Sequence, residues 1–279
     1  MQQEKNNMKT TLRTLALLFV LCCLTAGAYA INPLKEYTYT PKDLGLEYTE
    51  DSVMTSDGYR IHIWNLPGKE GNDRSVLIAY ADAGNMGQWL SVGATLNLLG
   101  YDVWMFDWRG FGCSQDFATD KDLLYHSEYL LDFGAVLGHV ATVRNRPVDV
   151  LALSMGTIIT GEHLRQYPGN KSLIRSCIMD GFVTDPSETV RILNEDSGKS
   201  VRLPSAPQLL SPGFNSKDVS LPMLLIHATG DTVSPMRLLL PLTADTRVTL
   251  KEFDCRHLQA SFTHTEDYFT AIDAFIKAH

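Results

Sequence analysis

The sequence predicts a single α/β domain, built on a mostly parallel sheet of eight strands with helices on both of its faces. The main observation is that short apolar runs alternate with segments of helical character from residue 31 onward, which is typical of strands joined by helices. No long linker, low-complexity tract or internal repeat interrupts that alternation. The length that remains, roughly 250 residues, suits one domain with one core.

The first thirty residues have the features of a secretory signal peptide. Three basic residues precede an apolar run over residues 15–24, and Ala28-Tyr29-Ala30 offers the small residues of a cleavage site. The apolar run is too short to cross a bilayer comfortably. We therefore expect cleavage after Ala30 and export of residues 31–279 to the periplasm or the medium. An uncleaved anchor or a buried first helix is the alternative.

The order of the expected elements begins with an antiparallel hairpin, because residues 46–54 and 59–64 flank the turn signal Ser56-Asp57-Gly58. Further strands are expected over residues 75–80, 102–106, 148–153, 174–179, 223–227 and 247–253. Helices are expected over residues 87–99, 123–143 and 155–167, and from residue 266 onward. A proline-containing stretch over residues 186–220 precedes the seventh strand and is expected to form a short lid-like insertion.

Charge and motif content exclude several classes of function. The net charge is −8, and it becomes −10 without the first thirty residues, which hold three basic residues and one acidic residue. Nucleic acids and anionic membranes demand basic surfaces, so neither is an expected partner. The sequence has no Walker loop, H-E-x-x-H helix, C-x-x-C pair or complete G-x-G-x-x-G, so we expect no metal or cofactor. Three cysteines follow the signal peptide, and whether any two of them pair is open: Cys113, Cys177 and Cys255.

The turn Ala152-Leu153-Ser154-Met155-Gly156 joins a predicted strand to a predicted helix. It matches the G-x-S-x-G pattern with alanine in the first glycine position, where the tight turn needs a small residue. Such a turn exposes the serine hydroxyl above the carboxyl edge of the sheet. Ser154 is therefore the candidate nucleophile.

A serine nucleophile needs a base, and the base needs an acid that orients it. Asp231 follows the predicted strand 223–227, and His257 follows the last predicted strand. Ligands bind at the carboxyl ends of parallel strands, so the three side chains are expected to meet there. Asp180 is the alternative acid, because it ends the strand before the insertion. His264 is interpreted as a surface residue.

These motifs resemble the α/β-hydrolase family over nearly the whole predicted mature chain. Phe106-Asp107-Trp108-Arg109-Gly110-Phe111-Gly112-Cys113-Ser114 looks like the family's F-D-x-R-G-x-G-x-S segment, in which Asp107 and Arg109 have structural roles. Residues 230–235, Gly-Asp-Thr-Val-Ser-Pro, are similar to its G-D-x-x-V-x-P acid loop. Among its branches, the monoacylglycerol-lipase and serine-aminopeptidase-like one is the most similar.

The resemblance also implies an oxyanion hole made of two backbone N–H groups. One belongs to Met155, the residue after the nucleophile, and the other to Asp82 after the third strand. This chain departs from the family there, because Tyr80-Ala81 replaces a His-Gly pair. A carboxylate beside a developing oxyanion opposes catalysis unless it points away.

The sequence therefore predicts an exported serine hydrolase that cleaves small esters through an acyl-enzyme, with thioesters or short peptides as further substrates of the same chemistry. The predicted triad is Ser154, His257 and Asp231. The alternative is a catalytically silent hydrolase fold that binds a small molecule or a protein. Oligomeric state and acyl specificity are open.

Overall fold

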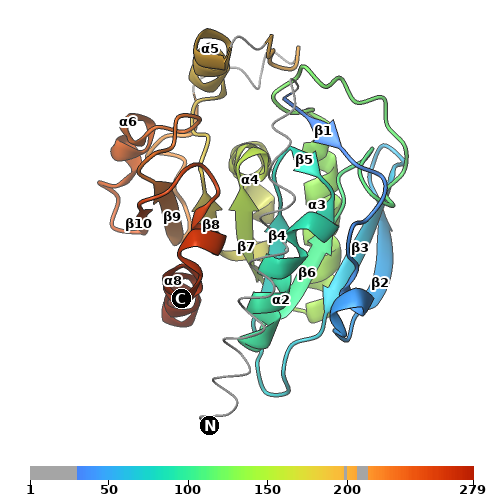
Figure 1. The fold of residues 1–279 in the computed structure, drawn as a ribbon. Helices are drawn as coiled ribbons and strands as arrows, with labels where there is room; N and C mark the ends of the chain where they lie inside the picture. The colour runs from blue at the N-terminus through green and yellow to red at the C-terminus, as the bar shows by residue number, and fades with distance from the viewer. Residues whose placement is uncertain (1–29, 198–199, 206–212) are drawn as a thin grey trace.

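The computed structural model describes residues 30–197, 200–205 and 213–279 (Figure 1). Apart from Ala30, the predicted signal peptide lies outside these residues. The strands are β1 (Asn32–Pro33), β2 (Thr49–Met54), β3 (Arg60–Leu66), β4 (Ser75–Ala79), β5 (Ala83–Gly84), β6 (Asp102–Phe106), β7 (Val148–Leu153), β8 (Ile174–Asp180), β9 (Met223–Ala228) and β10 (Val248–Phe253). The α-helices are α2 (Leu90–Leu98), α3 (Tyr129–Arg144), α4 (Met155–Gln166), α5 (Pro186–Ser197), α6 (Met236–Leu239), α7 (Ala260–Thr263) and α8 (Thr265–Ala278).

Eight strands form the central sheet in the order β10-β9-β8-β7-β4-β6-β3-β2. Five neighbouring pairs are parallel, and the pairs that contain β3 are antiparallel. From β4 the chain crosses to β6 on one side and later to β7 on the other, so right-handed connections place α2 and α3 on opposite faces. Figure 1 shows α2 and α8 in front of the sheet and α3 behind it. The predicted fold class is confirmed.

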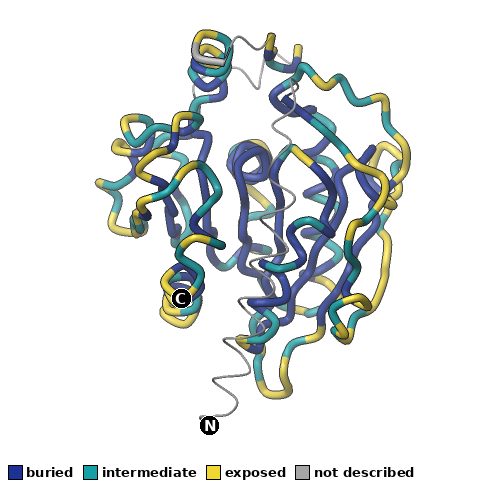
Figure 2. Tube along the Cα trace, viewed as in Figure 1, coloured by how far each residue is buried: buried dark blue, intermediate teal, exposed yellow. Residues whose placement is uncertain are grey.

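The core follows the middle of this sheet (Figure 2). Every residue of β4, β6, β7 and β9 is buried. These strands are continuous apolar runs because helices cover both of their faces. Within the described ranges, no helix has the length and apolar character that a membrane span requires.

The expected helix over residues 123–143 was wrong at its start, because α3 begins at Tyr129. Residues 122–124 pair instead with the segment after α5. The backbone N–H of Leu124 donates to the carbonyl of Arg202 at 2.8 Å, and the N–H of Arg202 donates to Asp122 at 2.8 Å. These long-range hydrogen bonds replace those that a helix would have made. The predicted insertion itself contains α5, which lies above the sheet in Figure 1.

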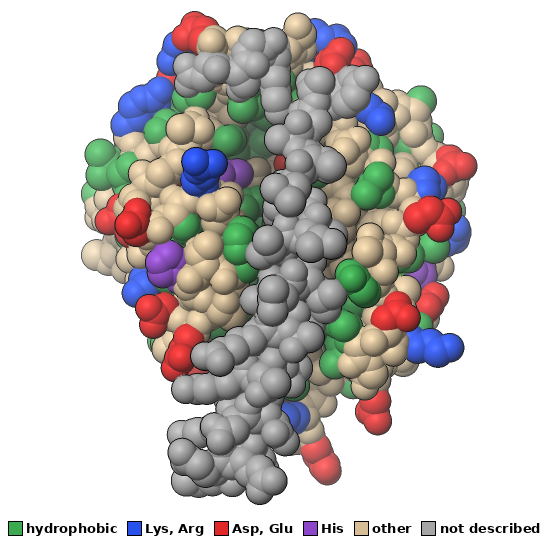
Figure 3. Space-filling model, viewed as in Figure 1, with side chains coloured by type: hydrophobic (Ala, Val, Ile, Leu, Met, Phe, Trp, Pro, Cys, Tyr) green, Lys and Arg blue, Asp and Glu red, His purple; other side chains and the backbone are tan. Residues whose placement is uncertain are grey.

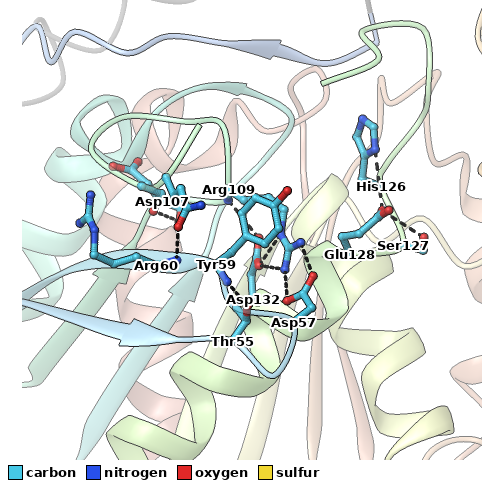
Figure 4. A network of polar contacts seen from close by, with 12 residues as sticks. Thr55, Asp57, Tyr59, Arg60, Asp107, Arg109, His126, Ser127, Glu128 and Asp132 are labelled. Atoms are coloured by element: carbon cyan, nitrogen blue, oxygen red, sulfur yellow. Dashed lines mark hydrogen bonds and ion pairs between the residues drawn. The ribbon is translucent and has the colours of Figure 1, made fainter. Parts of the chain in front are cut away.

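A buried ion cluster joins the β2–β3 hairpin to α3 (Figure 4). The side chain of Arg109 is fully buried between Asp132 on α3 and Asp57 in the hairpin turn. Its guanidinium lies 2.8 Å from Asp132 Oδ1 and 2.6 Å from Asp57 Oδ2, and it stacks 4.1 Å from the centre of the Tyr59 ring. The predicted structural role of Arg109 fits these contacts, since each charge has a partner.

Candidate functional site

Ser154 lies at the turn between β7 and α4, with φ 47° and ψ −111°. Non-glycine residues rarely adopt such angles, and they do so mainly at functional sites. The turn is tight because α4 starts against β4, where a Cβ on Gly156 would lie 1.9 Å from the carbonyl oxygen of Ala79. The glycine two residues after Ser154 has this steric cause.

The structure brings the three predicted triad residues into one hydrogen-bonded chain. His257 Nε2 lies 2.8 Å from Ser154 Oγ, and His257 Nδ1 lies 2.6 Å from Asp231 Oδ2. Asp231 follows β9 and His257 follows β10, so both belong to loops at the carboxyl edge of the sheet. The Asp231 side chain is fully buried, whereas 19% of the His257 side chain is exposed. This arrangement can move a proton from a serine hydroxyl to an imidazole.

The charges of the site favour a protonated imidazole over a protonated carboxyl. Burial alone would raise the pKa of Asp231, but the hydrogen bond and charge of His257, together with Ser234, lower that pKa to about 2. Burial would lower the pKa of His257, whereas the hydrogen bond and charge of Asp231, and the charges of Asp180 and Asp82, raise it. Asp231 therefore stays ionised, and the imidazole of His257 holds a proton more readily than a free imidazole does.

Ser234 holds Asp231 in place, and sequence reasoning missed it. Its hydroxyl donates to Asp231 Oδ2 at 2.8 Å, and its backbone N–H donates to Oδ1 at 2.9 Å. The N–H of Val233 also donates to Oδ1 at 2.8 Å. Part of this turn had a local signal, because an aspartate side chain commonly accepts a hydrogen bond from the backbone N–H two residues later.

Asp180, the alternative acid, makes a different hydrogen bond. Its Oδ2 accepts a hydrogen bond from the Tyr268 hydroxyl of α8 at 2.9 Å, while His257 Nδ1 faces Asp231. His264 lies at the start of α8, with its ring 5.5 Å from that of Phe253. In the structure, Asp231 and not Asp180 contacts His257 Nδ1, and His257 and not His264 contacts Ser154 Oγ.

The predicted oxyanion donors follow β4 and β7, two neighbouring strands. Met155 is the first residue of α4, where backbone N–H groups point out of the helix. The loop that holds Asp82 is fixed at both ends by the buried carboxylate of Asp107. Asp107 Oδ1 accepts hydrogen bonds from the Met86 N–H at 2.8 Å and from the Tyr80 hydroxyl at 3.1 Å. Tyr80 therefore has a structural partner that its sequence position alone did not predict.

The three cysteines after the predicted signal peptide are free thiols. Cys113 is exposed, Cys177 is buried in β8, and Cys255 is half-buried two residues before His257. Within the described part of the chain, no three or more histidine, cysteine, aspartate or glutamate side chains are grouped closely enough to hold a metal ion.

Comparisons with known proteins find the same fold. A family model described as alpha/beta hydrolase fold matches residues 74–201. The Escherichia coli K12 protein YfhR is 25% identical over 239 residues, covering 80% of this chain and 78% of its own. The mouse lysophosphatidylserine lipase ABHD12 is 25% identical over 237 residues, covering 75% of this chain. This chain spans about half (55%) of the length of ABHD12.

Solved structures share the same fold. The Pyrococcus furiosus esterase Pf2001 superposes with a TM-score of 0.70 at 19% identity, covering 89% of this chain and 97% of its own. Mouse alpha/beta hydrolase domain-containing protein 10 gives a TM-score of 0.64 at 16% identity, covering 82% of this chain and 99% of its own. With the family model and the sheet order, these likenesses show that the chain has the α/β-hydrolase fold.

Proposed function

We propose that this protein is an exported serine hydrolase that cleaves small esters. The observation that carries the proposal is the unbroken hydrogen-bonded path from Ser154 Oγ through His257 to Asp231, which begins at a strained strand-to-helix turn. A serine hydroxyl is a poor nucleophile, and this path supplies the base and the orienting acid that it needs.

The proposed reaction has two steps. His257 Nε2 takes the proton of Ser154 Oγ as that oxygen attacks the ester carbonyl, and it then gives the proton to the departing alkoxide. Water attacks the resulting acyl-enzyme with His257 again as the base, which releases the acid and restores Ser154. Asp231 keeps the imidazole in the required tautomer and stabilises its positive charge.

The backbone N–H groups of Met155 and Asp82 are the proposed donors to the oxyanion. Removal of one such donor costs about 2.7–4 kcal/mol of transition-state stabilisation in a well-studied protease. Donation by the backbone does not depend on the side chain, so an aspartate at position 82 is compatible with the role. The anchoring of its loop by Asp107 supports the proposal, because preorganised donors need no rearrangement during the reaction.

Small esters are the proposed substrates for two reasons. The segment beside the triad is apolar, since Phe182 follows Gly181, which packs against His257, and the Phe182 ring lies 5.2 Å from that of Phe214. Figure 3 shows hydrophobic side chains and a histidine gathered below α5, on the part of this face that grey atoms leave uncovered. An esterase and a lipase also occur among the similar proteins. Thioesters and short peptides would follow the same chemistry.

A second candidate function is a catalytically silent fold that binds a small molecule or a protein. The observation in its favour is the Asp82 side chain, whose negative charge is close enough to raise the pKa of His257. A carboxylate there opposes the formation of a negative oxyanion. The complete hydrogen-bonded path at Ser154 favours the enzyme.

Labelling with a fluorophosphonate probe tests the proposal. The mature protein should become labelled, and the Ser154→Ala variant should not. A panel of nitrophenyl esters of increasing chain length should be hydrolysed, with a preference that sizes the acyl site. A folded wild type that neither reacts with the probe nor cleaves any ester would favour the silent fold. N-terminal sequencing of the exported protein should begin at Ile31 if the proposed cleavage is correct.

A further inference from the structure

Asp180 and Gly181, at the carboxyl end of β8, lie against both the nucleophile and the base. The carbonyl oxygen of Asp180 accepts a hydrogen bond from the backbone N–H of Ser154 at 3.0 Å. Gly181 has φ 61°, and a Cβ at this residue would lie 2.5 Å from His257 Cε1. Both the position of the serine and the plane of the imidazole therefore depend on this two-residue segment.

The carboxyl group of Asp180 is buried, and its charge acts on the same imidazole. Asp180 is 2% exposed, and its Oδ2 accepts a hydrogen bond from the hydroxyl of Tyr268, which is itself fully buried. Burial raises the pKa of Asp180 to about 7, against the lowering effects of the Tyr268 hydrogen bond and the charge of His257. An ionised carboxylate in such a place is stabilised chiefly when a positive charge forms beside it.

We propose that Asp180, held by Tyr268, is a positioning residue that strengthens His257 as a base. It does so by placing a second carboxylate beside the imidazolium that forms when Ser154 loses its proton. Asp231 orients the ring through a direct hydrogen bond, whereas Asp180 acts through space and through the packing of Gly181. This inference rests on the proposed serine hydrolase function and adds a residue that the triad does not include.

Other titratable groups also act on these two residues, and their effects must be separated from that of Asp180. Tyr268, His257 and Asp231 act on Asp180 itself. Burial raises the pKa of the Cys255 thiol, and the charge of Asp180 adds to that rise. The charges of Asp231 and Asp82, from other elements, raise the pKa of His257. Burial lowers the pKa of His227 on β9, and the charge of His257 adds to that lowering.

The test compares Asp180→Asn and Tyr268→Phe with the wild type in a pH profile of kcat/KM. Loss of the Asp180 charge lowers the pKa of His257, so the acid limb should move to lower pH, while kcat at the plateau falls several-fold. Tyr268→Phe removes the hydrogen bond that favours ionised Asp180, so it should move the limb in the same direction by less. The double variant should move the limb no further than Asp180→Asn alone.

Tyr101→Phe is the matched control. The Tyr101 hydroxyl donates to Asp273 of α8 at 2.7 Å, so this variant also removes a tyrosine–aspartate bond between the sheet region and α8. It should lower stability about as much as Tyr268→Phe without moving the acid limb. Equal acid limbs in wild type, Asp180→Asn and Tyr268→Phe would overturn the proposal, as would an equal shift in the Tyr101→Phe control.

NMR titration of the His257 ring separates failure of this inference from failure of the proposed function. The ring titrates whether or not the protein hydrolyses esters. A lower midpoint in folded Asp180→Asn or Tyr268→Phe supports the coupling even in an inactive protein. An unchanged midpoint in Tyr268→Phe overturns it, including the case in which Asp180→Asn does not fold. Fluorophosphonate labelling of Ser154 reports the proposed function independently.

Discussion

The clusters of buried charge around Arg109 and around His257 differ in their construction. Around Arg109, hydrogen bonds from the guanidinium reach Asp57 and Asp132, and the arginine side chain is fully enclosed. Around His257, one end of the cluster is the fully buried carboxylate of Asp231. The other end is the strained Ser154, next to the partly exposed His257 ring. In the first cluster, here the closed cluster, every charge has a partner and the residues join elements of the fold. The second, here the open cluster, shares one proton between Ser154 Oγ and His257 Nε2.

The difference teaches how each cluster should respond to substitution. Removing a residue from the closed cluster leaves a buried charge without its partner, which lowers the free energy of unfolding. Removing a residue from the open cluster changes reactivity more than stability, because the strain at Ser154 opposes folding and the His257 ring is partly exposed. Measurements of activity and of stability on the same variants can therefore separate the two.

The largest expected effect is on catalysis, in Asp231→Asn. The amide cannot keep His257 in the required tautomer or stabilise its charge, so kcat for ester hydrolysis should fall about 10⁴-fold, as for the equivalent change in a serine protease. Stability, measured as the melting temperature, should change far less. A loss of kcat below about tenfold would show that another carboxylate orients the ring, and Asp180 would be the first to test.

Arg109→Met should give the largest effect on stability. Asp132 would remain buried without its cation, and breaking a buried ion pair in this way costs about 3–5 kcal/mol of unfolding free energy. Denaturant titration measures this loss, and kcat at a permissive temperature should stay near the wild-type value. Arg202→Met is the matched control, because its exposed pair with Asp120 should contribute about 0–1 kcal/mol. Equal losses in both variants would contradict the comparison.

A gain in stability is expected when the strain at Ser154 is removed. Ser154→Gly allows φ 47° without a steric penalty, so its unfolding free energy should exceed that of Ser154→Ala by about 1 kcal/mol or more. Both variants lose the hydroxyl and should be inactive, so the difference between them isolates the backbone term. A glycine variant less stable than the alanine variant would show that the angles are not strained.

The sequence predicted the parts of the site that follow from strand order. Ser154, Asp231 and His257 each follow a predicted strand, and parallel strands bring their carboxyl ends to one edge. The start of α3 could not be predicted, because residues 122–124 pair with Arg202, far along the chain. The same holds for the hydrogen bond between Asp180 and Tyr268, which lie 88 residues apart. Contacts of this kind depend on packing, which local patterns do not record.

The smallest expected effect is a pH-dependent one at the rim of the closed cluster, in Asp57→Asn. Hydrogen bonds from Arg109 lower the pKa of Asp57 to about 2. Because the folded pKa lies below the unfolded value of about 3.9, the stabilisation is present above that value and is lost as pH falls toward 2. The wild type should therefore melt above the variant at pH 7 and at pH 5. This difference should shrink between about pH 4 and pH 2.

The effect of Asp57→Asn should be modest, because 34% of the Asp57 side chain is exposed and solvent screens its charge. Asp116→Asn is the matched control, since its carboxylate pairs with Lys35 at 2.8 Å and is 93% exposed. Thermal melts from pH 2 to pH 8 should show a smaller difference for the control at every pH. A difference for Asp57→Asn that did not vary with pH would mean that shape, and not charge, holds the hairpin turn against Arg109. The ion pair with Asp132 would then be the one that stabilises the closed cluster through charge.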